Sequence, residues 1–107
     1  MLTLNVYYRC KSGQREAFYK ELSELGTRAV SMTEAGFVKY DYYFDAQDPD
    51  ILLLVEIWES QEALTAHSST ETFAKLQALY LAFRLLHNIN PSSLLPGFCE
   101  ADITSLL

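Results

Sequence analysis

The sequence predicts an α+β domain in which helices cover one face of an antiparallel sheet. Three observations lead to this prediction. Residues 2–10 alternate apolar and polar side chains, as a half-buried strand does. Residues 14–31 repeat apolar side chains at helical spacing. The runs 37–44 and 51–59 are typical of strands, and the turn-forming sequence DAQDPD separates them, as in an antiparallel hairpin.

Periodicity defines the first strand and the first helix. One face of the strand is expected to carry five side chains: Leu2, Leu4, Val6, Tyr8 and Cys10. Asn5 lies on the opposite face, where we expect it to line an interface between sheets. Four apolar residues at spacings of four, three and four line one side of a helix from Gln14 to about Ser31: Phe18, Leu22, Leu25 and Ala29.

The later elements follow from composition and capping residues. The run 37–44 is aromatic and β-branched, and the run 51–59 is apolar at nearly every residue, so we expect both faces of that third strand to be covered. Ser60 can cap a helix that starts at Gln61. A second helix is expected to start at Glu71, with its cap at one of the two preceding residues: Thr70 or Ser69.

With a fourth strand somewhere between residues 92 and 103, the order becomes the split βαβ arrangement of ferredoxin-like domains, which we expect to form one domain over residues 1–107. Such a sheet leaves one face open, and four apolar residues of the third strand point to it: Ile51, Leu53, Val55 and Ile57. A second copy of the chain would cover them, so we expect a homodimer that pairs through its sheet faces. The tail over residues 88–107 is a candidate for exchange between the two copies.

Composition excludes several classes of function. The formal charge of −6 and the pI near 4.7 argue against nucleic-acid binding. Cys10 and Cys99 stand far apart without a CxxC motif, which indicates neither a metal site nor a disulfide framework and fits a reducing cytoplasm. The N-terminus does not resemble a signal peptide, and the apolar runs are too short to span a membrane.

The end of the third strand brings chemically active side chains towards the helices. Alternation places Glu56 and Trp58 on the inward face of the strand. On the short helix that follows, His67 comes three and four residues after apolar positions, so its ring is expected to point inward. A carboxylate and an imidazole would then meet beside the indole.

Our functional interpretation assigns catalysis to His67 and Glu56. Glu56 would orient or polarise the imidazole, and His67 would take a proton from a phenolic or enolic substrate. Trp58, Tyr40 and Phe73 are the expected substrate-binding residues. The alternative is that these groups form a satisfied polar contact that fixes the helix to the sheet, with Trp58 and Tyr40 as packing residues.

The motif E-x-W-E-S-x-E-A-L-x-x-H, which runs from Glu56 to His67, resembles the antibiotic biosynthesis monooxygenase family. Three upstream segments are similar to that family in the same order: YYRCKSGQREAF, EAGFVKYDYY and DAQDPDILLLVEIW. The resemblance covers residues 2–80. It implies a dimer of ferredoxin-like domains with face-to-face sheets and a pocket between sheet and helices. Family members include oxygenases of quinols or anthrones without metal or flavin, haem-degrading enzymes and an isomerase of a phosphorylated sugar.

The sequence departs from two branches of that family. Leu54 stands where the anthrone oxygenases have a catalytic Asn, and the haem-degrading set of Asn, Trp and His falls nearest Val6, His67 and Gln77. Similarity is therefore closest to the quinol-monooxygenase branch, which shares Glu56, Trp58 and His67. The resemblance implies a monooxygenase with dioxygen as co-substrate and no bound cofactor or metal. An isomerase or other proton-transfer enzyme, and a non-catalytic ligand-binding or dimerisation module, are the alternatives.

Overall fold

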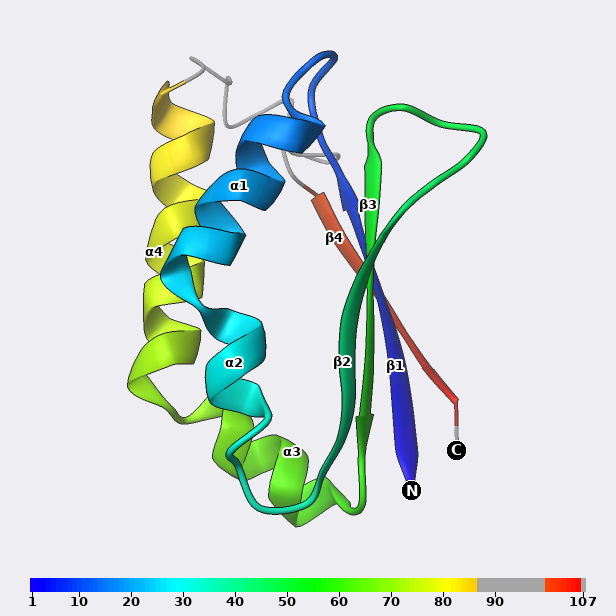
Figure 1. Cartoon of the computed structure of the whole chain (residues 1–107), viewed down its shortest axis with the longest axis vertical. Helices are drawn as coiled ribbons and strands as arrows, with labels where there is room; N and C mark the ends of the chain where they lie inside the picture. Colours follow the sequence, from blue (N-terminus) through cyan, green and yellow to red (C-terminus); the bar gives the residue numbers. More distant parts are fainter. Residues whose placement is uncertain (87–99, 107) are drawn as a thin grey trace.

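The computed structural model describes residues 1–86 and 100–106, with side chains up to residue 79. Within the described residues, eight elements follow one another: β1 (Leu2–Arg9), α1 (Arg15–Leu25), α2 (Thr27–Ser31), β2 (Phe37–Phe44), β3 (Ile51–Trp58), α3 (Gln61–Ser68), α4 (Glu71–Leu86) and β4 (Glu100–Leu106). The strands form one antiparallel sheet in the order β2-β3-β1-β4. All the helices lie on one face of this sheet (Figure 1). The predicted ferredoxin-like α+β fold is confirmed.

Strict alternation on β3 and β1 separates the two faces of the sheet. Along β3, every second residue from Leu52 to Trp58 is buried under the helices, while the residues between them are half-buried. Leu4 pairs with Glu56, and Val6 pairs with Leu54, so inward residues of both strands lie side by side. The core joins them to α1 and α4 through apolar side chains: Tyr8, Phe18, Leu22, Leu52 and Leu76. The face predictions for the first and third strands are confirmed.

The prediction of one helix over residues 14–31 is wrong, because Gly26 divides it into α1 and α2. Gly26 has a φ of 78°, in the left-handed region that glycine adopts at helix ends, and its N–H donates to the carbonyl oxygens of Leu22 and Ser23. Because of this break, the side of α2 that is buried does not continue the buried side of α1. Ala29 is therefore exposed, and the neighbouring polar residues Thr27 and Ser31 are buried in its place.

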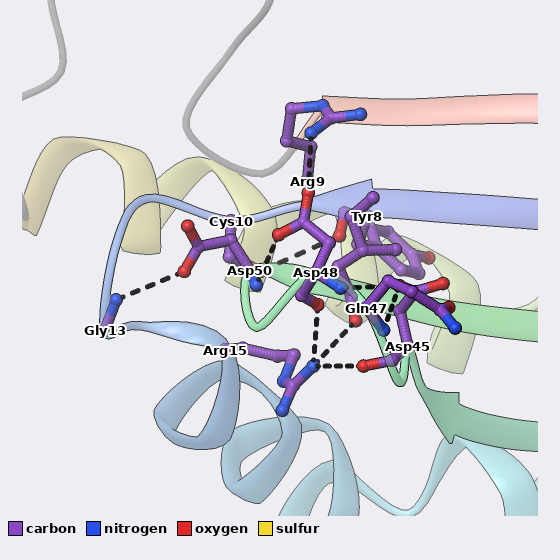
Figure 2. Close-up of polar contacts among 10 residues, drawn as sticks. Tyr8, Arg9, Cys10, Gly13, Arg15, Asp45, Gln47, Asp48 and Asp50 are labelled. Atoms are coloured by element: carbon purple, nitrogen blue, oxygen red, sulfur yellow. Dashed lines mark hydrogen bonds and ion pairs between the residues drawn. The ribbon is translucent and has the colours of Figure 1, made fainter.

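A largely buried arginine ties α1 to the turn between β2 and β3. The Nη1 of Arg15 donates to the backbone carbonyl oxygens of Asp45, Asp48 and Ile51, at 3.3, 3.1 and 3.2 Å. Figure 2 shows this guanidinium beside Asp45 and Asp48 of the hairpin. The guanidinium also lies 4.4 Å from the ring centroid of Phe44, in cation–π geometry. This Arg15 anchor gives the carbonyl of Asp45 a donor and adds a second donor to the carbonyls of Asp48 and Ile51, which also accept from the backbone N–H groups of Ile51 and Asp45. It fixes the end of the sheet opposite α3.

The predicted fourth strand near the end of the chain is present, but its position differs from the predicted range. A fourth strand is present, but it spans Glu100–Leu106 and therefore lies later than the predicted range of 92–103. Here β4 pairs with β1 of the same chain. Residues 87–99 and 107 lie outside the described residues, so exchange of the tail over residues 88–107 with a second copy stays a prediction. Within the described part of the chain, the helices are too short or too polar to cross a membrane.

Candidate active site

Strand β3 presents a carboxylate and an indole to the helices at the α3 end of the sheet. Glu56 and Trp58 are 7% and 0% exposed, as their inward alternation predicts. The indole Nε1–H of Trp58 donates to Oε1 of Glu56 at 3.1 Å, so both polar groups have a partner inside the core. The ring of Phe37 meets the indole edge to face at 6.0 Å. Packing therefore fixes the carboxylate in one place.

Helix α3 brings His67 to this carboxylate. The helix starts at the predicted position, where the side chain of Ser60 accepts a hydrogen bond from the backbone N–H of Ala63. It can lie close to the chain before β2 because Gly36 faces it: a Cβ built on Gly36 would collide with Cβ of Ala63, and the φ of 79° also favours glycine. His67, in the last turn of α3, is 6% exposed. The predicted inward direction of its ring is confirmed.

The imidazole of His67 lies between two carboxylates. Its Nδ1 is 2.7 Å from Oε1 of Glu34, and its Nε2 is 3.6 Å from Oε1 of Glu56. The first distance is that of a short, charge-assisted hydrogen bond, and the second is too long for a hydrogen bond. The structure thus joins His67 to Glu56 as the sequence predicts, but it places a different carboxylate in direct contact with the ring.

Three aromatic rings surround the same imidazole. The indole of Trp58 lies 4.6 Å from it, centroid to centroid, at an interplanar angle of 34°. Tyr40 and Phe73 approach it edge to face at 5.8 and 5.7 Å. All five residues that the sequence singled out therefore lie within one cluster. Their roles in catalysis and substrate binding stay predictions.

Glu34 is the site residue that sequence reasoning missed. It lies in the turn between α2 and β2, where its N–H donates to the carbonyl oxygen of Ser31 and its own carbonyl accepts from the N–H of Phe37. Turns have no periodicity from which an inward direction could be predicted. The available signal was an acidic residue two positions before Gly36, a glycine that the fold needs for close approach to α3.

Two neighbouring tyrosines on β2, the buried Tyr40 and the half-buried Tyr42, lie beside the site. Tyr40 is 1% exposed, and its ring lies 5.8 Å from that of Tyr42. The hydroxyl of Tyr42 shares a hydrogen bond of 2.9 Å with Oγ1 of Thr27 on α2. Burial raises the pKa of both tyrosines above the ordinary value, and the neighbouring Glu56 raises both further. Tyr40 therefore keeps its proton and can act as a hydrogen-bond donor.

Burial also raises the pKa of Glu56. The hydrogen bond from Trp58 and the nearby His67 lower this pKa in part, while Glu34 raises it. Two carboxylates and an imidazole in a largely desolvated space can hold a proton at several positions. This is the property that general acid–base catalysis requires.

The residue two positions before Glu56 on β3 is apolar and buried. Leu54 points inward two residues before Glu56 and is 1% exposed, so the position at which the anthrone oxygenases use Asn is here part of the core. Among the described side chains, no group of three or more His, Cys, Asp or Glu residues is placed to hold a metal ion.

Comparisons with known proteins identify the family. The family model described as antibiotic biosynthesis monooxygenase matches residues 1–79, which include the whole His67 cluster. Among solved structures, a protein of unknown function from Bacteroides thetaiotaomicron, named as a possible oxidoreductase, has a TM-score of 0.74 and 24% identity, over 98% of this chain and 94% of that chain. A Pseudomonas aeruginosa protein has a TM-score of 0.69 and 27% identity, over 98% and 90%.

A third structure, from Nitrosomonas europaea, has a name that provisionally assigns it to the same family. Its TM-score is 0.71 at 20% identity, over 99% of this chain and 94% of that chain. Identities at this level support the fold alone. A comparison with curated proteins finds no match. Because the family model covers most of the chain, including the cluster around His67, the chain belongs to the antibiotic biosynthesis monooxygenase family.

Proposed function

We propose that the protein is a monooxygenase that oxidises a small quinol or hydroxylated aromatic metabolite with dioxygen, without a metal or flavin cofactor. The observation that supports this proposal is the burial of His67 between Glu34 and Glu56, directly beside the indole of Trp58. A desolvated base next to aromatic rings suits a substrate that is flat and carries an acidic hydroxyl. Membership of the family gives the reaction class its independent support.

In the proposed mechanism His67 accepts the proton of a substrate hydroxyl at Nε2. The phenolate that remains is rich in electrons and passes one of them to dioxygen, which leaves a phenoxyl radical and superoxide. These two combine through a new carbon–oxygen bond to give a peroxide, whose outer oxygen takes the proton held on His67. His67 then removes the proton from the carbon that gained oxygen; the O–O bond breaks as that carbon forms a carbonyl, and the departing hydroxide takes this second proton and leaves as water. The protein supplies a base, an orientation and a water-poor site.

Oxygen consumption tests this proposal. A panel of benzoquinols, naphthoquinols and other hydroxylated aromatics is incubated with the protein in an oxygen electrode, and the product of any active compound is analysed after reaction under ¹⁸O₂. We expect enzyme-dependent oxygen uptake with one ¹⁸O atom in the product. Failure of every compound to increase oxygen uptake, together with binding of some of them, would reject the monooxygenase and favour a ligand-binding module.

Proton transfer without dioxygen, such as isomerisation, is the second candidate. It is favoured by Leu54, which places an apolar side chain where the anthrone oxygenases use Asn, while the base His67 is retained. Isomerisation next to a carbonyl group needs the same base and no oxidant. Product formation at the full rate under strictly anaerobic conditions would select this candidate over the oxygenase.

We also propose that two copies pair through the outward face of the sheet. In the single chain this face keeps four apolar side chains of β3 only half-buried: Ile51, Leu53, Val55 and Ile57. Light scattering after size exclusion tests the pairing, with Val55→Lys as the variant. We expect the wild type at twice the mass of one chain and the variant at the mass of one. A wild type at the mass of one chain would reject the dimer.

A further inference from the structure

The two carboxylates beside His67 approach opposite nitrogens of the same ring. They differ in their distance from the ring, in their other hydrogen bonds and in their exposure to solvent. Glu34 lies 2.7 Å from Nδ1, within hydrogen-bonding distance. Glu56 lies 3.6 Å from Nε2, and the same oxygen already accepts the indole N–H of Trp58. Only one of the two can therefore determine where the ring carries its proton.

The two carboxylates also differ in how far their side chains are exposed to solvent. The side chain of Glu34 is 16% exposed, whereas those of Glu56 and His67 are 9% and 7% exposed. Burial is the main cause that raises the pKa of Glu56, and Glu34 adds to it. The carboxylate of Glu34 thus keeps some contact with water while its Oε1 lies within hydrogen-bonding distance of the ring.

We propose that Glu34 is the positioning residue of this site: it accepts the Nδ1–H of His67, which leaves the lone pair of Nε2 free to act as the base. This inference rests on the proposed function, because it names the group that prepares the base. It gives the orienting role, which the sequence assigned to Glu56, to the carboxylate in hydrogen-bonding contact.

The assignment also predicts how the ring changes during the reaction. When Nε2 takes a proton from substrate, the imidazole becomes positively charged, and ionised Glu34 at 2.7 Å stabilises that charge. When Nε2 returns the proton, the ring regains the same tautomer. Among the side chains that the structure describes, the titratable groups that face His67 are Glu34 from the turn, Glu56 from β3 and Tyr40 from β2, while α4 contributes the ring of Phe73.

Nitrogen NMR on the whole chain tests the proposal without any substrate. The wild type, labelled with ¹⁵N-histidine, is titrated with acid and base, and the His67→Asn variant assigns the signals, since the chain has only two histidines. We expect neutral His67 to carry its proton on Nδ1. A neutral ring protonated on Nε2 would overturn the proposal. The measurement is made on the wild type, so it does not depend on whether a variant of Glu34 folds.

Glu34→Gln gives the second reading. Its amide N–H can donate to Nδ1, so we expect the tautomer to invert, the imidazolium to lose its proton at lower pH, and kcat to fall by roughly 10²–10⁴-fold with little change in KM. Glu34→Asp is expected to restore part of the rate. Glu62→Gln is the matched control, because it removes an exposed carboxylate from the first turn of the same helix as His67.

Failure of this inference and failure of the proposed function give different results. If the wild type has the Nδ1–H tautomer and Glu34→Gln inverts it, the positioning role holds, whether or not any quinol is oxidised. If a quinol is oxidised but Glu34→Gln changes neither the tautomer nor kcat, the monooxygenase stands and the role of Glu34 is rejected.

Discussion

The two ends of the sheet each bury a side chain that can carry a positive charge, and they surround it with different partners. At the hairpin end, Arg15 donates to three backbone carbonyl oxygens and lies over Phe44. At the α3 end, His67 lies between the carboxylates of Glu34 and Glu56 and among three aromatic rings. Both ends have satisfied hydrogen bonds, yet the partners are neutral carbonyl oxygens at one end and carboxylates at the other.

This difference separates a structural contact from a candidate site. A guanidinium keeps its charge at every physiological pH, and the carbonyl oxygens around it are neutral, so the Arg15 anchor stays the same whatever the conditions. An imidazole can accept or donate a proton through its ring nitrogens, and at the α3 end two carboxylates lie beside those nitrogens. Burying ionisable groups costs free energy of desolvation, so a buried imidazole beside two carboxylates is a candidate for a chemical role.

The largest expected effect comes from removing the indole that covers His67. Trp58→Ala should reduce the free energy of unfolding by about 3–5 kcal/mol, because a fully buried aromatic side chain is lost. Arg15→Ala should reduce it by about 1–3 kcal/mol, since three hydrogen bonds disappear at a partly exposed turn. Urea denaturation measures both. Equal losses, or a larger loss for Arg15→Ala, would contradict the view that packing fixes the α3 end.

A glycine substitution tests how tightly α3 is held against the turn before β2. Gly36→Ala should reduce the free energy of unfolding by about 2–4 kcal/mol, as left-handed strain adds to a collision with Ala63. Gly13→Ala is the matched control: its φ is also 79°, but an added Cβ would meet no atom within 4 Å. It should cost only about 1–2 kcal/mol. If the two variants lose the same stability, the close approach of α3 is not what Gly36 provides.

The pH dependence of stability should have opposite signs at the two ends. Burial raises the pKa of Glu56, so the folded protein binds more protons than the unfolded chain above the ordinary value of 4.5. The contribution of Glu56 is therefore complete below that pH and is lost as the pH rises through the folded pKa. A hydrogen bond from Arg15 lowers the pKa of the exposed Glu16, whose contribution is instead lost as the pH falls.

Two conservative variants check these signs. Glu56→Gln can still accept from Trp58, and its stability relative to wild type should increase between pH 4 and pH 8, as measured by thermal unfolding across that range. Glu16→Gln should show the reverse trend with a smaller amplitude, because the group is exposed to solvent. A constant difference between Glu56→Gln and wild type at every pH would show that burial does not perturb this carboxyl.

The smallest effect is expected at an exposed ion pair beside the Arg15 anchor. Arg9 lies 3.3 Å from Asp48, and their side chains are 54% and 36% exposed. Arg9→Ala should change the free energy of unfolding by less than about 1 kcal/mol, since solvent screens such pairs. A loss as large as that of Arg15→Ala would mean that side-chain charge, and not the three backbone carbonyls, fixes the hairpin.

The residues of the cluster differ in how far the sequence could predict them. Strand alternation gives Glu56 and Trp58 their inward direction, and helical spacing gives it to His67, because both rules depend only on local geometry. Glu34 meets His67 across 33 positions of sequence and from a turn, so no local rule connects the two. Tertiary contacts of this kind become visible only when the chain is folded.

Local spacing also fails to predict the break between α1 and α2. The spacing of Phe18, Leu22, Leu25 and Ala29 fits one continuous helix, and that pattern outweighed the signal of a single glycine. The folded chain uses Gly26 to end α1 in the left-handed conformation, which turns Thr27 towards the hydroxyl of Tyr42. The sheet was easier to predict, because its strands carry unambiguous two-residue periodicity.

One kinetic comparison tests the central claim most directly: kcat/KM of wild type and His67→Asn with the quinol that gives the fastest oxygen uptake. The Asn amide can take the place of Nδ1–H and donate to Glu34, while the base at Nε2 is lost. We predict a fall of roughly 10²–10⁴-fold in kcat/KM in a variant that still folds cooperatively, although the smaller side chain loses some of the packing against the three rings. An unchanged kcat/KM would show that the buried imidazole is not the base of this reaction.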